Sequence, residues 1–262
     1  MAARLGARCL PPAWLCRQAW QGQGRHYRAA LCTELKQPLT IQEVAPHPVR
    51  PQEVRIDVHF CGVNFADVLL CRGQYQEKLP LPFTPGLEFS GTVLETGADV
   101  NTVKKGDRVI GVSNFYAMAE QCVIDQKSLW KIPENVSLQD ATVLPVSYGT
   151  AILALGHRAR IQPGLAWEGR IVVLGFAGGN IASLPSNLLL LKNISAMGLY
   201  WSRYQHRDFA VFSKSISTAL QYYQQGLIHP RIGAVFKLEK INDAFFHVMQ
   251  RKSTGKVLLS LK

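Results

Sequence analysis

One glycine-rich turn has the residue types that could bind a phosphate group. Gly175-Phe176-Ala177-Gly178-Gly179 follows the apolar run from Ile171 to Leu174. A glycine-rich turn between a strand and a helix can hold a phosphate on its backbone N–H groups. The spacing differs from the dinucleotide fingerprint G-x-G-x-x-G, and Pro185 follows too soon for a long helix. On its own, the turn predicts a strand end and a loop.

A second short motif partly matches a phosphate-binding loop near the C-terminus. Gly255-Lys256 lacks both the upstream glycine and the Ser or Thr after the lysine that a P-loop needs. We therefore expect these two residues to be ordinary surface or strand-edge sequence.

Six cysteines could in principle bind a metal or form disulfides. No two of them form a C-x-x-C pair, and no histidine stands at metal-ligand spacing from any of them. The cysteines are Cys9, Cys16, Cys32, Cys61, Cys71 and Cys122. The pattern argues against a zinc site or a disulfide framework. We expect Cys61 and Cys71 to be buried and to behave as small apolar residues.

The elements of the first half are indicated by alternation and turn residues. Apolar residues alternate strictly from Val54 to Phe60, which predicts a half-buried strand. Asn64 can then cap a short helix that runs through Leu70. Further strands are expected at Leu87 to Leu94 and at Ala117 to Ile124, with turns near Gly97 and Gly106-Asp107.

The elements of the second half alternate between helices and apolar runs. Ser137 is expected to cap one helix, and Ser147 or Tyr148 to begin another that reaches about His157. Ile171 to Leu174 and Ser195 to Leu199 are expected to be buried parallel strands. A further helix is predicted from Ser213 to Gln225.

The net charge of +11 is unevenly placed, with +5 before the first acidic residue and +6 in the rest of the chain. Five arginines precede the first acidic residue, Glu34. An Arg-rich segment without acids is typical of a mitochondrial transit peptide, here residues 1–27, and predicts a location in the mitochondrial matrix. No apolar stretch approaches the roughly 20 residues of a membrane-spanning helix. The other basic residues are dispersed, which argues against nucleic-acid binding.

A series of motifs recurs in the order found in one known enzyme family. The motifs are Cys61-Gly62-Val63-Asn64-Phe65-Ala66-Asp67, Arg72-Gly73-Gln74-Tyr75, Thr84-Pro85-Gly86-Leu87-Glu88-Phe89-Ser90-Gly91, Lys105-Gly106-Asp107-Arg108-Val109, Tyr148-Gly149-Thr150-Ala151, Gly169-Arg170-Ile171-Val172-Val173-Leu174-Gly175, Asn242-Asp243-Ala244-Phe245 and Thr254-Gly255-Lys256-Val257. From about Tyr27 onward, the chain resembles the quinone oxidoreductase branch of the zinc-free medium-chain dehydrogenase/reductase family. It looks most like the mitochondrial quinone oxidoreductase-like proteins.

The resemblance implies an α/β plus β fold, with a GroES-like antiparallel β domain and a truncated Rossmann-type parallel sheet. Residues 28–150 would form the GroES-like substrate domain and residues 151–234 the remnant of the dinucleotide-binding domain. Residues 235–262 would return to the first domain.

The resemblance also implies that most of the dinucleotide-binding core is missing. In the family, Pro-Gly-Glu and a strand with the Gly-rich phosphate turn follow the helix that ends near Ile161. Here Pro163-Gly164 continues directly into Leu165-Ala166-Trp167-Glu168-Gly169, a junction at residues 164/165. At roughly 30 residues for each βαβ unit, the loss is on the order of 90 residues. The fingerprint that binds the pyrophosphate lies in that part of the family fold.

The residue roles that we expect come from the same resemblance. Family members reduce quinones or activated alkenes with NADPH and without zinc. Asn64 matches the Asn beside the nicotinamide, and Tyr75 matches a Tyr of the substrate pocket whose phenol could donate to an enolate oxygen.

Four further residues match the cofactor side of the family's site. Asp67 fits the same strand-to-helix turn as Asn64, where holding the backbone is the expected role, and Thr150 fits a Thr near the nicotinamide, with a helix-start role as the alternative. Gly175 and Phe176 would be a remaining wall of the cofactor pocket. Zinc-dependent relatives carry Cys and His at the positions of Asn64 and Leu87, so we expect no metal.

Three interpretations of function therefore remain open. The chain could be an NADPH-dependent quinone or enone reductase, although one that lacks the phosphate fingerprint. It could be a catalytically silent family member. It could also be a noncatalytic partner that docks through an exposed strand edge or the family's dimer surface around Leu188 to Leu199, as a homo-oligomer or as a heterodimer with intact relatives.

Overall fold

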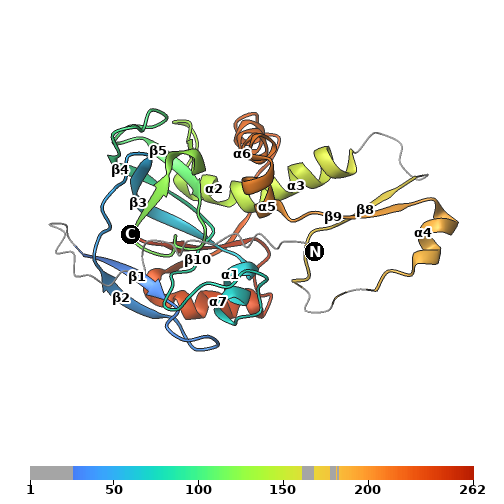
Figure 1. Cartoon of the computed structure of the whole chain (residues 1–262), viewed down its shortest axis with the longest axis horizontal. Coiled ribbons are helices and arrows are strands. Elements are labelled where there is room, and N and C mark those ends of the chain that lie inside the picture. Colours follow the sequence, from blue (N-terminus) through green and yellow to red (C-terminus); the bar gives the residue numbers. More distant parts are fainter. Residues whose placement is uncertain (1–25, 161–167, 178–180, 182) are drawn as a thin grey trace, which may run out of the picture.

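The structure is a computed structural model of the 262-residue chain, and it describes residues 26–160, 168–177, 181 and 183–262. Most of the expected junction, residues 161–167, and the expected transit peptide up to residue 25 lie outside the described residues. Figure 1 shows a body made of sheet and helices, from which one pair of strands extends to a short helix.

The body is built on a mixed seven-stranded sheet. Its strand order is β10-β11-β3-β4-β5-β7, with β6 paired to β3, and every pair is antiparallel except β10 with β11. A separate antiparallel pair, β1 with β2, precedes it. The bounds are β1 Tyr27–Leu31, β2 Thr40–Val44, β3 Glu53–Val63, β4 Glu88–Thr96, β5 Arg108–Val112, β6 Gln121–Asp125, β7 Leu129–Lys131, β10 Ile232–Lys237 and β11 Lys256–Ser260.

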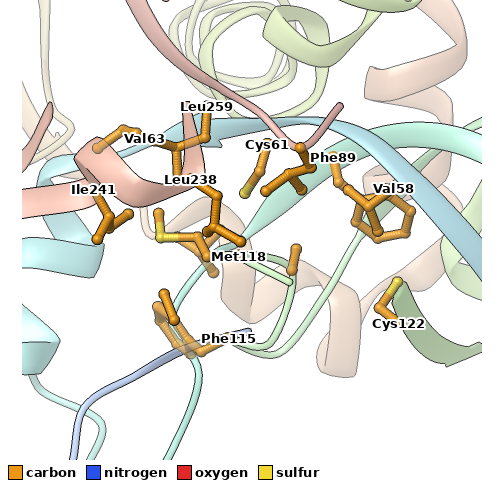
Figure 2. Packing of buried hydrophobic residues seen from close by; sticks show 14 of the residues in the cluster. Val58, Cys61, Val63, Phe89, Phe115, Met118, Cys122, Leu238, Ile241 and Leu259 are labelled. Atoms are coloured by element: carbon orange, nitrogen blue, oxygen red, sulfur yellow. The ribbon is translucent and has the colours of Figure 1, made fainter. Parts of the chain in front are cut away.

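The main core lies against this sheet and explains why β3 forms. Val54, Ile56 and Val58 are fully buried, as the alternation predicts for one face of a strand. Figure 2 shows how residues of β3 and β4 meet Met118 and the C-terminal residues Leu238 and Leu259 in this core. The last quarter of the chain therefore completes a core that the first half begins.

The helices differ from the expectation at one point. α1 (Phe65–Cys71) begins after Asn64, as predicted, and Ser137 caps α2 by accepting the Asp140 N–H at 3.0 Å. No separate helix begins at Ser147 or Tyr148. A single helical run continues through α2 (Leu138–Val143), the π-helical η3 (Leu144–Tyr148), α3 (Gly149–Ile152) and the π-helical η4 (Leu153–Ala159).

The run continues through Pro145, which lies in the first turn of η3. The wider π-type turns of η3 accommodate this residue, which has no backbone N–H. The expected break in the helix is thereby avoided.

A second core cluster joins this helical run to two later helices. α5 (Trp201–Arg207) and the amphipathic α6 (Phe209–Gln224) bury Trp201, Phe212 and Ile216 against Ile110 of β5 and Leu144. The structure confirms the helix predicted from Ser213 to Gln225 and places its start four residues earlier. Three further described helices are η2 (Gln126–Ser128), η5 (Leu238–Lys240) and α7 (Ile241–Met249).

The expected remnant of the parallel sheet has two described strands. β8 (Arg170–Val173) and β9 (Ser195–Gly198) pair in parallel, and α4 (Ser186–Lys192) connects them. Both strands were predicted to be buried, and this is wrong, since neither strand nor α4 contains a buried residue. A parallel strand is buried only where neighbouring strands and helices cover both faces of the sheet.

Candidate functional site

Three polar residues from distant parts of the sequence form a buried network at the end of β3. The Asn64 Nδ2 donates to Glu88 Oε1 at 3.1 Å, and Asn64 Oδ1 accepts from Lys256 Nζ at 2.6 Å. Lys256 Nζ also lies 2.5 Å from Glu88 Oε1, and this carboxylate is completely buried. The Val146 N–H donates to the other oxygen of Glu88 at 2.8 Å. Every polar atom of the Asn64 and Glu88 side chains therefore has a partner inside the protein.

The backbone beside this network is shaped for the Glu88 side chain. A Cβ added to Gly62, on β3, would lie 2.5 Å from Glu88 Oε1. That distance is too short for non-bonded atoms, so glycine is needed for the buried carboxylate to reach Asn64 and Lys256.

Asp67 fixes the turn that carries Asn64. Its two carboxylate oxygens accept the backbone N–H of Asn64 at 2.8 Å and that of Gly86 at 3.0 Å. The side chain is fully buried, and burial raises the pKa of Asp67 to about 7, although both backbone bonds and the Lys256 charge oppose the rise. Asp67 thus holds the backbone, the role that the sequence analysis favoured.

An open pocket of about 370 Å³ lies beside Lys256. The helical run contributes Ser147, Tyr148 and Ala151 to its wall, Arg231 comes from the residues just before β10, and Lys256 begins β11. The described lining residues include two cations and no acid. Thr150 is the second residue of α3 (N-cap Tyr148), is partly buried, and lies between the pocket residues Tyr148 and Ala151 in the sequence.

Tyr75 is held in a different set of contacts. Its hydroxyl lies 3.2 Å from the hydroxyl of Tyr200, which donates to Glu77 Oε1 at 2.5 Å. Its ring meets the Phe115 ring edge-on at a centroid distance of 5.6 Å. Burial raises the pKa of Tyr75, while the hydrogen bond with Tyr200 opposes this rise. Tyr200 lies just after β9, so the remnant of the second domain contacts the expected substrate side.

Gly175 and Phe176 lie in the segment that follows β8. A Cβ added to Gly175 would meet no atom within 4 Å, and the Phe176 side chain is 46% exposed. The Cβ position of Gly175 is therefore open, and residues 178–180 of the same turn lie outside the described part of the chain.

Glu88, Lys256 and Tyr200 are site residues that the sequence analysis did not identify. Glu88 had a detectable signal, because it is the one charged residue in the strand expected at Leu87 to Leu94, and buried charges are paired. Lys256 follows Gly255 in the motif that we compared with a P-loop, and its position at the start of β11 brings it to Glu88 instead. Tyr200 carries no signal in its local sequence.

Within the described part of the chain, no group of three or more His, Cys, Asp or Glu side chains could hold a metal ion. The described cysteines Cys32, Cys61, Cys71 and Cys122 are buried and unpaired to one another by disulfides. Burial raises the pKa of Cys61 well above that of a free thiol. Among the described residues, no helix is long and apolar enough to cross a membrane.

Two family models match the chain in succession. Residues 50–144 match the alcohol dehydrogenase GroES-like domain, and residues 154–259 match the zinc-binding dehydrogenase model. The first match covers the strands and the helix that carry Asn64, Asp67, Tyr75 and Glu88. The second covers β8, β9 and the return of the chain to the large sheet.

Curated relatives match over the whole chain. Quinone oxidoreductase-like protein 2 of Mus musculus is 66% identical over 350 aligned positions, which cover 100% of both chains. A homologue from Nematostella vectensis is 34% identical and covers 94% of this chain and 92% of its own. The alignment with the mouse protein has 350 positions, and this chain has 262 residues. Therefore 88 of the aligned positions contain no residue of this chain. This agrees with the loss of about 90 residues expected from the motifs.

Solved structures show the same fold at low identity. Human synaptic vesicle membrane protein VAT-1 homolog-like protein has a TM-score of 0.83 at 18% identity, covering 91% of this chain and 99% of its own. The quinone oxidoreductase of Thermus thermophilus, solved alone and with NADPH, has a TM-score of 0.78 at 22% identity and covers 89% and 100%. Fold, family models and full-length relatives agree: the chain belongs to the quinone oxidoreductase branch of the medium-chain dehydrogenase/reductase family, among the quinone oxidoreductase-like proteins, with most of the dinucleotide-binding core missing.

Proposed function

We propose that the chain retains the substrate side of a zinc-free, NADPH-dependent quinone or activated-alkene reductase and has weak or no reductase activity. The observation that carries this proposal is the contrast between the two halves of the site. The network of Asn64, Glu88 and Lys256 is complete and buried, whereas the sequence has no G-x-G-x-x-G fingerprint after a strand and a Cβ added to Gly175 would meet no atom within 4 Å.

Asn64 and Tyr75 are the residues that we propose would contact a quinone or enone. The polar groups of both residues are hydrogen-bonded within the protein. Asn64 bonds Glu88 and Lys256, and Tyr75 bonds Tyr200. A substrate carbonyl could accept from either residue only if one of these bonds were exchanged. Such an exchange costs part of the gain from binding, which supports weak rather than efficient turnover.

The proposed cofactor contacts are similarly incomplete. Asp67 supports the turn of Asn64, and Thr150 lies between pocket residues in α3; these two positions support our proposal that both belong to the nicotinamide side. Gly175 and Phe176 are not among the described lining residues of the pocket. The pocket's Arg231 and Lys256 leave some affinity for an anion, although Glu88 already neutralises Lys256.

The test is a titration of the full chain with NADPH, followed by fluorescence and melting temperature. Ligand binding to the folded state raises the melting temperature by linkage, and 100-fold saturation is worth about 2.7 kcal/mol. We expect no saturable shift below millimolar NADPH and no NADPH oxidation with a quinone or an enone. The mouse relative serves as the intact reference protein.

Turnover by this chain at a rate comparable to the mouse relative would overturn the proposal. A Tyr75→Phe variant separates a true reaction from contamination, because removing the phenol should lower kcat if Tyr75 donates to the developing oxyanion. Unchanged NADPH oxidation in that variant would assign the rate to another source or another donor.

The proposed location is the mitochondrial matrix. It is supported by the five arginines and the absence of acids before Glu34. Import into isolated mitochondria, with removal of about 27 residues, is the expected result.

A second candidate function is that of a noncatalytic partner of intact relatives. It is favoured by the exposure of the surface around Leu188 to Leu199, where Leu190 and Leu191 are 77% and 71% exposed. Co-expression of the chain with the mouse relative tests this function. We expect heterodimers with the wild-type chain and none with the Leu191→Glu variant. The mouse subunit should keep its normal activity in the heterodimer.

A further inference from the structure

The hydroxyl groups of Tyr75 and Tyr200 and the carboxylate of Glu77 form a chain of two hydrogen bonds. The Tyr75 hydroxyl lies 3.2 Å from the Tyr200 hydroxyl, and the Tyr200 hydroxyl lies 2.5 Å from Glu77 Oε1. Tyr75 is buried, Tyr200 is partly buried and Glu77 is exposed. The chain of bonds therefore runs from the interior of the protein to its surface.

Two parts of the fold bring these groups together. Tyr75 and Glu77 lie two residues apart in the segment after α1. Tyr200 lies between β9 and α5, where Figure 1 shows the chain returning from the pair of parallel strands to the body of the molecule. Its neighbours Leu199 and Trp201 are buried in the second core cluster and hold its backbone in place. The remnant of the second domain thus supplies one hydroxyl group to the expected substrate side.

The number of protons determines the direction of both hydrogen bonds. An ionised carboxylate can only accept, so the bond between Tyr200 and Glu77 uses the one proton of the Tyr200 hydroxyl. The Tyr200 oxygen then has no proton left for Tyr75 and can only accept from it. The bond between the two tyrosines therefore uses the proton of Tyr75.

The two distances show which bond holds its proton more firmly. A length of 2.5 Å is typical of a hydroxyl that donates to a carboxylate, and such a bond is about twice as strong as one between neutral groups. The length of 3.2 Å between the tyrosines is greater than that of most O–H···O bonds. Burial and then the hydrogen bond to Glu77 raise the pKa of Tyr200, while Gln76 opposes the rise. Tyr200 therefore keeps its proton and directs it to Glu77.

We propose that Tyr200 is a positioning residue whose oxygen accepts the proton of Tyr75, because Glu77 holds the proton that Tyr200 could otherwise offer. Under the proposed function, on which this role rests, Tyr75 donates to a quinone or enone oxygen. A substrate oxygen must then displace the Tyr200 oxygen before it can accept that proton. Giving up one hydrogen bond between neutral groups lowers the affinity for the substrate about two- to tenfold.

The direction of the hydrogen bond can be measured without any ligand. In the full chain labelled with the NMR-active carbon isotope at tyrosine Cζ, the Tyr75 signal is the one that is lost in Tyr75→Phe. A phenol that donates has its Cζ signal moved downfield, toward the phenolate position, and a phenol that accepts has it moved upfield. Tyr200→Phe removes the acceptor, so we expect the Tyr75 signal to move upfield. An unchanged signal or a downfield shift would overturn the proposal.

A second variant tests the role of Glu77. Glu77→Ala releases the proton of Tyr200, which can then donate to Tyr75, so the Tyr75 signal should again move upfield although both hydroxyl groups remain. Glu134→Ala is the matched control, because Glu134 is an exposed acid outside this chain of bonds, and it should leave the signal in place. A Tyr75 signal that Glu77→Ala does not move would overturn the role assigned to Glu77.

The effect on a substrate is measured as the affinity for a quinone. Duroquinone, the fully methylated benzoquinone, is a suitable probe because it has no free ring position to which a cysteine thiol could add. Titration of the full chain, followed through the Tyr75 signal, should show that Tyr200→Phe binds about two- to tenfold more tightly than the wild type. The same substitution made in the Tyr75→Phe variant should bring no gain, because that variant has no phenol proton to donate.

Failure of this role and failure of the proposed function give different results. If duroquinone binds and Tyr200→Phe leaves its affinity unchanged, or if the gain persists in the Tyr75→Phe variant, the role of Tyr200 is wrong and the proposed function stands. If duroquinone moves the Tyr75 signal in no variant, the substrate side is not retained, and the proposed function and the effect of Tyr200 on a substrate are both wrong. The signal measured without ligand still decides the direction of the bond in that case.

Discussion

Lys256, at the start of the last strand, lies 2.5 Å from the fully buried carboxylate of Glu88 on β4. The pair joins the C-terminal return to the first domain in the interior of the protein. The same ammonium group donates to Asn64 at 2.6 Å, so the position of the expected substrate-binding amide depends on the end of the chain.

The first prediction concerns the loss of this ammonium group. Lys256→Met leaves Glu88 buried without its cation, and an unpaired buried charge costs about 3–5 kcal/mol of the free energy of unfolding. Urea denaturation of the full chain measures this loss. The matched control is Lys240→Met, since Lys240 forms a solvent-exposed pair with Asp243 at 3.4 Å and should lose no more than about 1 kcal/mol.

A second variant distinguishes the charge from the packing of the lysine stem. Lys256→Met combined with Glu88→Gln removes both charges and should recover part of the stability lost in the single variant. If the double variant is as unstable as the sum of the two single variants, the ion pair is not what Lys256 contributes.

The second prediction concerns the pH dependence of stability through Asp67. Burial raises the pKa of Asp67 from its ordinary 3.8 to about 7, so the folded protein holds this proton more tightly than the unfolded chain. The free energy of unfolding should therefore fall as pH rises from about 4 to 7, by at most about 1.4 kcal/mol per pH unit from this group, and level off above pH 7.

The difference between wild type and Asp67→Asn isolates this group from the histidines that titrate in the same range. Glu88 and Lys256 are the charged groups that act on Asp67, and both remain in the variant. We expect the stability difference to change with pH between 4 and 7 and to be constant above. A difference that is constant throughout would show that Asp67 keeps an ordinary pKa.

The third prediction concerns the hydrogen bond between Tyr75 and Tyr200. A double-mutant cycle with Tyr75→Phe and Tyr200→Phe should give a coupling energy of about 0.5–1.5 kcal/mol in urea denaturation. The control cycle pairs Tyr75→Phe with Tyr223→Phe, because Tyr223 donates to Asp140 elsewhere in the fold. That cycle should be additive, and equal coupling in both cycles would exclude a direct Tyr75–Tyr200 bond.

The parts of the fold that the sequence predicted are those determined locally. β3 follows from alternation over a few residues, and α1 and α2 follow from Asn64 and Ser137 at their starts. The exposure of β8 and β9 depends on whether neighbouring strands and helices cover them. A short apolar run has the same sequence pattern in a covered strand and in an uncovered one. This is why their parallel pairing was predicted correctly and their burial was not.

The candidate site was predictable in part for the same reason. Asn64 and Asp67 lie within one turn, so a motif can identify both. The partners that determine what these residues can do come from far along the chain, as Lys256 lies 192 positions from Asn64, and Tyr200 lies 125 positions from Tyr75. No periodicity or spacing reports contacts of that range, and the return of β11 to β3 creates the first of them.

The fourth prediction concerns two glycines of the helical run that carries Thr150. A Cβ added to Gly149 would lie 3.0 Å from the Trp201 indole, whereas one added to Gly156 would meet nothing within 4 Å. Gly156→Ala should raise the free energy of unfolding by about 0.5–1 kcal/mol, because alanine loses less backbone freedom on folding. Gly149→Ala should leave the free energy of unfolding unchanged or lower it by about 1–3 kcal/mol, since the Trp201 indole cannot move away easily.

The Trp201 indole is held by two contacts. Its Nε1 donates to Ser215 at 3.1 Å, and its ring packs on Phe212 at a centroid distance of 4.5 Å. Urea denaturation of both variants measures the difference, and equal stabilisation by both would mean that Trp201 does not pack against this helix as the structure shows.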